Sequence, residues 1–361
     1  VRRLRAAGAV IVGRTTMPEF GQFPFTESLA TGVTRNPFDL DRSPGGSSGG
    51  SAVAVATGTV PVALGADGGG SIRIPASACG LVGLKPTRGC ISVAPLSQHW
   101  YGLVVLGGMS RSVRDSALLL DVISGSTPVD RWSVPPPREP FAAVAAREPG
   151  TLRIAWSTKC VTPGVDTDPE ITAATEQVAR ALVRLGHRVH RTAPRWPVAT
   201  DAFLPQFYGG MAAEAGQVEH PERLEPRTRQ TARLARWATP RVVERAIRRG
   251  ERVAAAVDAR LLTDADVFLL PTMPKLPPPV GLLDGMDAVR AQVATLPYVA
   301  NTVLTNVSGH PALALPAGLS ASGLPIGVQL IARRGEEGLL LAIAAQIEAS
   351  RPDFWPGVAT P

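Results

Sequence analysis

Two clusters of glycine and serine, separated by an apolar run, constrain this chain more than any other part of its sequence. The first reads PGGSSGG over residues 44–50, and the second reads GGGS over residues 68–71. Such runs are often flexible linkers, but the intervening SAVAVATGTVPVALGAD carries more apolar surface than a linker would. We therefore expect both clusters inside a folded domain. Glycine is used there where the backbone adopts a positive φ or where another group must approach the backbone closely.

Outside the clusters, segments with helical periodicity alternate with short apolar segments of strand character. This alternation predicts the α/β class, with a mixed sheet. We interpret residues 126–263 as an inserted, substrate-facing and mostly helical region. The predicted helices are residues 111–125, 168–186 with Asp168 as N-cap, most of 211–263, and 335–350; the predicted strands are 9–14, 152–157, 187–193, 264–272 and a hairpin over 312–333 that turns at 320–323.

Composition argues against several classes of function. The 361 residues are 45% hydrophobic, which is enough for a large core, and the net charge of +7 comes from arginines scattered along the chain. The densest basic run, 229–252, contains one aromatic residue, Trp237, so we interpret it as a solvated helix face rather than a nucleic-acid site. Three cysteines without paired spacing predict a reducing compartment and no zinc site. No apolar segment reaches 18 residues, so we expect a cytoplasmic protein.

Two common motifs fit the clusters poorly. Residues 46–50 match the G-x-S-x-G pattern with Ser48 as nucleophile, but a turn precedes them where that pattern requires a strand. A phosphate-binding loop would need Gly-Lys-Ser/Thr after a cluster, and neither cluster has it. The sequence therefore favours neither chemistry.

Taken together, the two clusters resemble the signature region of the amidase signature family, over residues 41–90. The segments GAVIVGRTTMPEF, TNVSGHPALALPAGL and GLPIGVQLIAR extend this resemblance over nearly the whole chain. The resemblance implies one amidase domain over 1–361, with helices on both faces of a central twisted mixed sheet. It also implies hydrolysis of a small-molecule carboxylic amide without cofactor or metal, with no nucleic-acid or membrane partner, and it allows a homodimer.

The resemblance further implies a Ser–Ser–Lys catalytic arrangement. Ser71 aligns with the nucleophile, and Ser47 aligns with a bridging serine that follows a cis peptide bond. A serine hydroxyl needs an adjacent base to attack at neutral pH. A second hydroxyl both donates and accepts, so it can relay the proton and return one to the leaving amine.

Residues around the two serines are expected to complete the site. Amides of the glycines beside Ser71 would bind the oxyanion that forms on the substrate carbonyl. We interpret Ser48, Asp67 and Arg73 as supports of the two loops, with substrate contact as the alternative for Asp67 and Arg73. The predicted oxyanion-hole glycines are Gly68, Gly69 and Gly70.

The lysine of this arrangement has no counterpart among the residues before Ser47. Lys85 aligns with a lysine that has a structural role in the family. Lys159 and Lys275 lie in regions that do not align with the catalytic lysine. The opening VRRLRAAG reads as a helix that ends at Gly8 and lacks an N-cap. We expect a truncated amidase, with a natural pseudoenzyme as the alternative.

The sequence constrains the identity of the substrate less than it constrains the type of reaction. Overall, the sequence is more similar to bacterial amidases of small, apolar amides than to the A-type component of glutamyl-tRNA(Gln) amidotransferase. That component remains an alternative, and a catalytically silent binding protein is another. We assign His99 no catalytic role. The candidate pocket residues are Phe23, Phe25, 98–101, Phe207, Tyr208 and 301–305.

Overall fold

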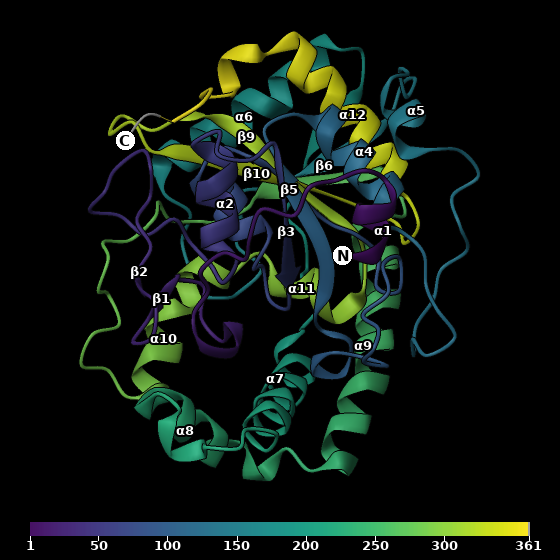
Figure 1. Ribbon diagram of the computed structural model, residues 1–361. Helices are drawn as coiled ribbons and strands as arrows, with labels where there is room; N and C mark the ends of the chain where they lie inside the picture. Colours follow the sequence, from purple (N-terminus) through teal and green to yellow (C-terminus); the bar gives the residue numbers. More distant parts are fainter. Residues whose placement is uncertain (360–361) are drawn as a thin grey trace.

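A central sheet of eight strands organises the computed structural model, which describes residues 1–359 (Figure 1). The strands are β3 (Val62–Asp67), β4 (Val82–Lys85), β5 (Val105–Ser110), β6 (Arg153–Trp156), β7 (Arg188–Arg191), β8 (Val267–Pro271), β9 (Ala312–Leu319) and β10 (Pro325–Ala332). Their order is β3-β5-β4-β9-β10-β8-β6-β7. β6 pairs in parallel with β7 and β8, and the other neighbours are antiparallel. The sheet is therefore mixed. A separate short ribbon joins β1 (Glu27–Ser28) and β2 (Gly32–Val33).

Helices cover both faces of the sheet (Figure 1). One face carries α4 (Val113–Ile123), α5 (Phe141–Ala145), α6 (Pro169–Arg184) and α12 (Glu337–Ser350). The other carries α7 (Thr200–Ala215), α9 (Pro240–Leu261) and α11 (Val303–Ser308), with α8 (Pro226–Leu234) and α10 (Ala288–Val299) beyond them. The remaining helices are α1 (Arg2–Ala6), α2 (Gly49–Ala56), α3 (Arg73–Ala78) and the 3-10 turns η1 (Glu19–Gly21), η2 (Trp100–Gly102), η3 (Pro221–Arg223), η4 (Ala235–Trp237) and η5 (Pro352–Phe354).

The two-residue period of β8 shows how the sheet divides the core. Val267 and Leu269 pack with residues of α4, α6 and α12, whereas Phe268 and Leu270 pack with residues of α7 and α9. All four are buried. Successive side chains of a strand point to opposite faces, so a continuous apolar run indicates a strand covered on both sides. The predicted α/β/α arrangement is confirmed.

Most predicted elements are present. α4, α6 and α12 lie within the segments predicted as helices, and β6, β7 and β8 lie within segments predicted as strands. The predicted hairpin is β9 and β10, joined through residues 320–323. No helix of residues 1–359 is both long and apolar enough to cross a bilayer.

One predicted strand is wrong, and one predicted N-cap residue has the predicted position but makes no capping hydrogen bond with its side chain. Residues 9–14 form no strand, and Val10 and Val12 are 85% and 75% exposed, because this segment lies outside the sheet and no neighbouring strand binds its backbone. Asp168 occupies the N-cap position of α6, but its side chain caps nothing. It accepts instead from Lys275 Nζ at 2.5 Å.

Residues 126–263, predicted as an inserted and mostly helical region, contribute both strands and helices. They contain β6 and β7, which belong to the central sheet. They also contain α5 and α6 on one face of the sheet, and α7, α8 and α9, which form the lower layer in Figure 1. The last three helices extend from Thr200 to Leu261.

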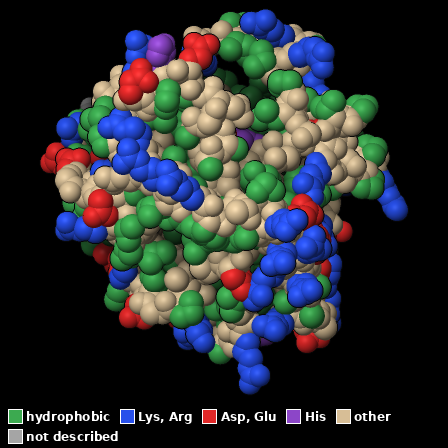
Figure 2. Space-filling model, turned by 90° about the horizontal axis from the view of Figure 1, so that it is seen from below, with side chains coloured by type: hydrophobic (Ala, Val, Ile, Leu, Met, Phe, Trp, Pro, Cys, Tyr) green, Lys and Arg blue, Asp and Glu red, His purple; other side chains and the backbone are tan. Residues whose placement is uncertain are grey.

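The dense basic run lies largely on α9, and its arginines gather along one side of the face drawn in Figure 2. Arg248 pairs with Glu244 on the same helix, and Arg249 pairs with Asp201 on α7. Both arginine side chains are more than half exposed. The run is therefore a solvated helix face with local ion pairs, as the sequence predicted.

Candidate active site

The second glycine/serine cluster forms the turn between β3 and α3. β3 ends at Asp67 and α3 begins at Arg73, so Ser71 lies at the carboxyl end of a sheet strand. Gly70 has a φ of +128°, which favours glycine, and a Cβ there would lie 2.5 Å from Thr302 Oγ1. The turn that carries Ser71 thus packs directly against the residue before α11.

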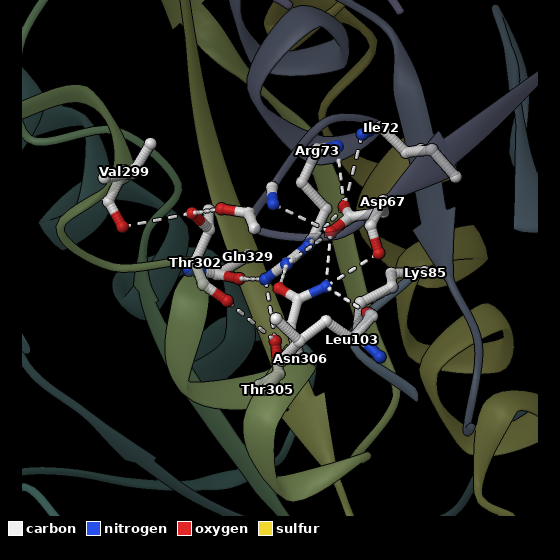
Figure 3. A network of polar contacts seen from close by, with 12 residues as sticks. Asp67, Ile72, Arg73, Lys85, Leu103, Val299, Thr302, Thr305, Asn306 and Gln329 are labelled. Carbon is white, nitrogen blue, oxygen red and sulfur yellow. Dashed lines mark hydrogen bonds and ion pairs between the residues drawn. The ribbon is translucent and has the colours of Figure 1, made fainter. Parts of the chain in front are cut away.

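A buried network of polar side chains holds this turn (Figure 3). Asp67 and Arg73 have no solvent exposure, and Nε and Nη2 of Arg73 each donate to the Asp67 carboxylate at 2.9 Å. The guanidinium also donates to Thr305 at 2.8 Å, Gln329 at 3.0 Å and Asn306 at 2.7 Å. Burial alone would raise the pKa of Asp67, but the Arg73 charge and its hydrogen bonds lower that pKa to about 2. The Asp67 carboxyl is therefore charged at neutral pH, and its pair with Arg73 ties the turn to α11 and β10.

The Asp67 carboxylate also binds one of the amides predicted to form an oxyanion hole. The Gly70 N–H donates to Asp67 Oδ1 at 2.8 Å, so it is not free for a substrate oxygen. This contact removes Gly70 from the predicted set. Gly69 lines the cavity described below, and its carbonyl accepts from Thr302 Oγ1 at 2.5 Å, which fixes the orientation of that peptide. Gly68 and Gly69 stay as candidate donors.

The first cluster forms a turn that leads into α2, and its glycines allow close packing. A Cβ on Gly46 would lie 2.8 Å from the backbone nitrogen of Phe25. Gly45 has a φ of +75°, and a Cβ there would lie 3.2 Å from the backbone of Pro75 in α3. Larger residues would push this turn away from α3.

Ser47 lies in this turn, directly after Gly46. The Gly46–Ser47 peptide bond is cis. Ser47 is buried, and its Oγ faces Gly21, since a Cβ on Gly21 would lie 3.0 Å from that oxygen. Gly21 and Ser71 line the same cavity, so the fold brings Ser47 and Ser71 to one region.

Ser48 connects the two clusters through the backbone. Its N–H donates to the carbonyl oxygen of Ser71 at 3.2 Å. Its Oγ accepts from the N–H of Ala66, near the end of β3, at 3.3 Å. Ser48 therefore holds the start of α2 against the end of β3.

A cavity opens at Ser71 between the second glycine/serine turn, α7 and α10. Its walls are apolar apart from a few uncharged polar groups, and no ionisable side chain among residues 1–359 lines it. The lining residues are Gly21, Gln22, Phe23, Pro24, Gly69, Ser71, Ile74, Trp100, Phe203, Phe207, Gln292, Thr295, Val299 and Val303.

The sequence predicted only part of this lining. Phe23 and Phe207 are in it, Trp100 is the member from 98–101, and Val303 is the member from 301–305. Phe25 and Tyr208 are not among the lining residues. The lining residues missed by sequence reasoning include Gln22, Phe203, Gln292, Thr295 and Val299.

His99 contacts Glu214 rather than the serine site. Its Nε2 lies 2.7 Å from Glu214 Oε1 on α7, and its imidazole is not part of the cavity at Ser71. The hydrogen bond to His99 lowers the pKa of Glu214. Within residues 1–359, no three His, Cys, Asp or Glu side chains form a potential metal site.

None of the chain's three lysines lines the cavity at Ser71. Lys85, at the end of β4, is fully buried, and its Nζ donates to the Pro86 carbonyl at 2.9 Å. Lys275 binds Asp168, and Lys159 is exposed. Burial, with the Arg73 charge nearby, lowers the pKa of Lys85 to about 7.

The lowered pKa of Lys85 predicts a pH dependence of stability. Folded Lys85 releases its proton near pH 7 but the unfolded chain holds it to about pH 10.5, so between these values the unfolded state binds more protons. The free energy of unfolding should therefore rise with pH across this window. Lys85→Met should remove that slope, as measured from urea midpoints at pH 6, 7, 8 and 9.

The matched control is Lys275→Met, because Lys275 is partly exposed and paired with Asp168. This variant should keep the pH slope of the wild type. An identical slope in the wild type and in Lys85→Met would contradict a buried lysine that loses its proton near pH 7.

Comparison with known proteins agrees with the fold. The family model "Amidase" matches residues 1–341. The chain is 47% identical over 354 residues to "Putative amidase AmiB2" of Mycobacterium tuberculosis, covering 98% of this chain and 75% of that protein. It is 42% identical over 374 residues to "6-aminohexanoate-cyclic-dimer hydrolase" of Paenarthrobacter ureafaciens, covering 98% and 76%.

Solved structures give the same result. A 6-aminohexanoate cyclic dimer hydrolase superposes with a TM-score of 0.93 at 39% identity, covering 99% of this chain and 78% of that one. The A-type component of glutamyl-tRNA(Gln) amidotransferase from Thermotoga maritima superposes with a TM-score of 0.80 at 30% identity, covering 99% and 78%. The chain belongs to the amidase signature family, and it is by family a hydrolase.

Proposed function

We propose that this chain hydrolyses an uncharged carboxylic amide through an acyl-enzyme formed on Ser71. The observation that carries the proposal is the position of Ser71 at the wall of an apolar cavity, with the Ser47 turn bound to it through the Ser48 amide. The buried Asp67–Arg73 pair fixes the Ser71 turn, so the nucleophile would be held before substrate binds.

The residues support a two-step reaction. Ser71 Oγ attacks the amide carbonyl while its proton passes to Ser47 and Ser47 passes its own hydroxyl proton to a base behind it, and the carbonyl oxygen becomes an oxyanion near the amides of Gly68 and Gly69. As the C–N bond breaks, Ser47 returns a proton to the departing amine, which leaves an ester on Ser71. Water then attacks the ester, and the carboxylic acid and free Ser71 result. The family resemblance implies a lysine as the base behind Ser47, and none of Lys85, Lys159 and Lys275 is assigned that role.

The cavity lining favours an uncharged substrate over glutamine, the amide donor of an amidotransferase. Glutamine carries an ammonium and a carboxylate, and burying either without a partner is costly. The lining contributed by residues 1–359 contains no charged side chain to pair with them. The aromatic residues Phe23, Phe203 and Phe207 instead provide apolar contact area.

A fluorophosphonate probe tests the nucleophile assignment. In the native protein from its source, the probe should form an adduct that peptide mass spectrometry places on Ser71, and the Ser71→Ala variant should stay unlabelled. Turnover would be tested with a panel of uncharged amides, namely 6-aminohexanoate cyclic dimer, hexanamide and acetanilide, here called the amide panel. A catalytically silent binding protein would give neither an adduct nor hydrolysis, and that pair of results would overturn the proposal.

A further inference from the structure

Three buried side-chain atoms without hydrogen-bond partners lie on residues that line the substrate cavity. They are Gln22 Oε1, Trp100 Nε1 and Gln292 Nε2, and Ser71 lines the same cavity. Trp100 Nε1 lies beside the Glu214 carboxylate, which leaves the two glutamine atoms for a ligand. An unpaired buried polar atom is costly, and such atoms are few in native proteins. The two glutamine residues share one cavity wall beside the candidate nucleophile, so one bound substrate would lie against both. Neither unpaired atom is exposed in the empty cavity, so each side-chain amide would turn toward the substrate on binding.

Gln22 is held at one end only. It follows η1 and is 7% exposed, and its Nε2 donates to Thr228 Oγ1 of α8. Oε1 has no partner among residues 1–359. If the amide were rotated by 180°, Oε1 would accept from the Thr228 hydroxyl and Nε2 would be the unpaired atom. In either orientation, Gln22 has one hydrogen-bonding atom to offer a ligand.

Gln292 faces the cavity from α10. It shares that face with Thr295 and Val299, at the i, i+3, i+7 spacing of one helix side, and both also line the cavity. The Thr295 hydroxyl donates to the Gln292 carbonyl at 2.8 Å, so the backbone is satisfied locally. The side-chain Nε2 is buried and has no hydrogen-bond acceptor within residues 1–359.

We propose that Gln22 and Gln292 bind a second, uncharged amide group of the substrate, separate from the amide that is hydrolysed. This inference rests on the proposed function and deepens it by naming a substrate class. A secondary or primary amide presents both an N–H donor and a carbonyl acceptor, which match Gln22 Oε1 and Gln292 Nε2 as they stand. The scissile carbonyl would be bound at Gly68 and Gly69, so these two glutamines are free for the second group. A purely apolar substrate would leave both glutamine atoms unpaired.

Matched compounds with one and two amides test the proposal. Hexanamide and adipamide have the same six-carbon chain, and adipamide adds a second amide on the acyl side. N-hexylacetamide and N,N′-diacetyl-1,4-diaminobutane make the same comparison on the amine side. Dissociation constants would be measured by ligand-observed NMR on the native protein, with hydrolysis rates measured in parallel. Binding should be stronger for the two-amide member of at least one pair, by about tenfold for two new hydrogen bonds.

Variants assign the preference to the two glutamines. Gln292→Leu should reduce the preference by about threefold to tenfold and leave binding of the single-amide member unchanged or stronger. Gln292→Met has a similar volume and no hydrogen-bond donor, so it should have the same effect. Gln22→Met tests the acceptor at similar volume. The control is Gln217→Leu, the same change at an exposed glutamine beyond α7, and it should keep the full preference.

The outcomes separate this inference from the proposed function. Equal binding of both members in both pairs would overturn the inference, whether or not Ser71 reacts with the fluorophosphonate. A preference that survives in both Gln292 variants and in Gln22→Met would also overturn it, because other groups would then be responsible. A preference that depends on the glutamines, in a protein without hydrolysis, would support the binding inference while removing the catalytic one.

Discussion

Ser71→Ala is expected to lower kcat/KM for the amide panel by roughly 10⁴- to 10⁶-fold, the range seen when a serine nucleophile is removed. Ser47→Ala should cost less, about 10²- to 10⁴-fold, because it removes a proton relay and leaves the attacking oxygen in place. Binding of uncharged amides should persist in both variants, since most of the cavity wall is apolar and is not changed. The measurement is steady-state hydrolysis by the native protein and each variant, with substrate binding followed separately.

Ser48→Ala separates this assignment from the competing G-x-S-x-G interpretation. Ser48 Oγ contacts the Ala66 backbone, so its removal should cost far less activity than the removal of Ser71. Ser350→Ala, at the exposed end of α12, is the control and should behave as wild type. Ser71→Ala activity within tenfold of the wild type, together with an inactive Ser48→Ala, would assign the nucleophile to the first cluster instead.

Local patterns explain what could be predicted of this fold. The helices α4, α6 and α12 have apolar spacing along their own sequence, and the β9–β10 turn is marked by its own serine and glycine residues. The contact from the Gly70 amide to Asp67 is also local, because an aspartate commonly accepts from a backbone N–H two or three residues later. That signal was present in the sequence and could have removed Gly70 from the predicted oxyanion hole.

The remaining differences depend on contacts between distant segments. Asp168 has the residue type of an N-cap, but Lys275, 107 residues away, provides a charged partner for its carboxylate. Residues 9–14 have the apolar character of a buried strand, and sequence alone does not tell whether a neighbouring strand is available. The positions of the two cavity glutamines also depend on contacts between distant segments. Gln22 and Gln292 line the same cavity only because α8 packs against α10. The spacing of Gln292, Thr295 and Val299 predicts one helix face but not what that face contacts.

The Asp67–Arg73 pair should make the largest single contribution to the stability of the site. Arg73→Met removes the charge that balances a fully buried carboxylate, and breaking a buried pair in this way typically costs about 3–5 kcal/mol. Adding Asp67→Asn should recover part of the loss, because no buried charge is then left without a partner. Activity should fall in both variants, since the carboxylate also positions the Gly70 amide beside Ser71. Urea unfolding at pH 7 measures the first effect, and hydrolysis of the amide panel measures the second.

The pH dependence distinguishes a charged buried pair from a merely packed one. Because the pKa of Asp67 is about 2 when folded and 3.8 ordinarily, the pair's contribution is fully present above pH 3.8 and is lost as the pH falls through 2. Without Arg73, burial raises the pKa of Asp67, so the folded variant takes up a proton at higher pH. The deficit of Arg73→Met relative to the wild type should therefore be smaller at pH 4 than at pH 7. Arg147→Met, which breaks an exposed pair with Glu139, should show little deficit at either pH. An Arg73→Met deficit that stays the same from pH 7 to pH 4 would mean that lost packing, and not an unbalanced Asp67 charge, destabilises the variant.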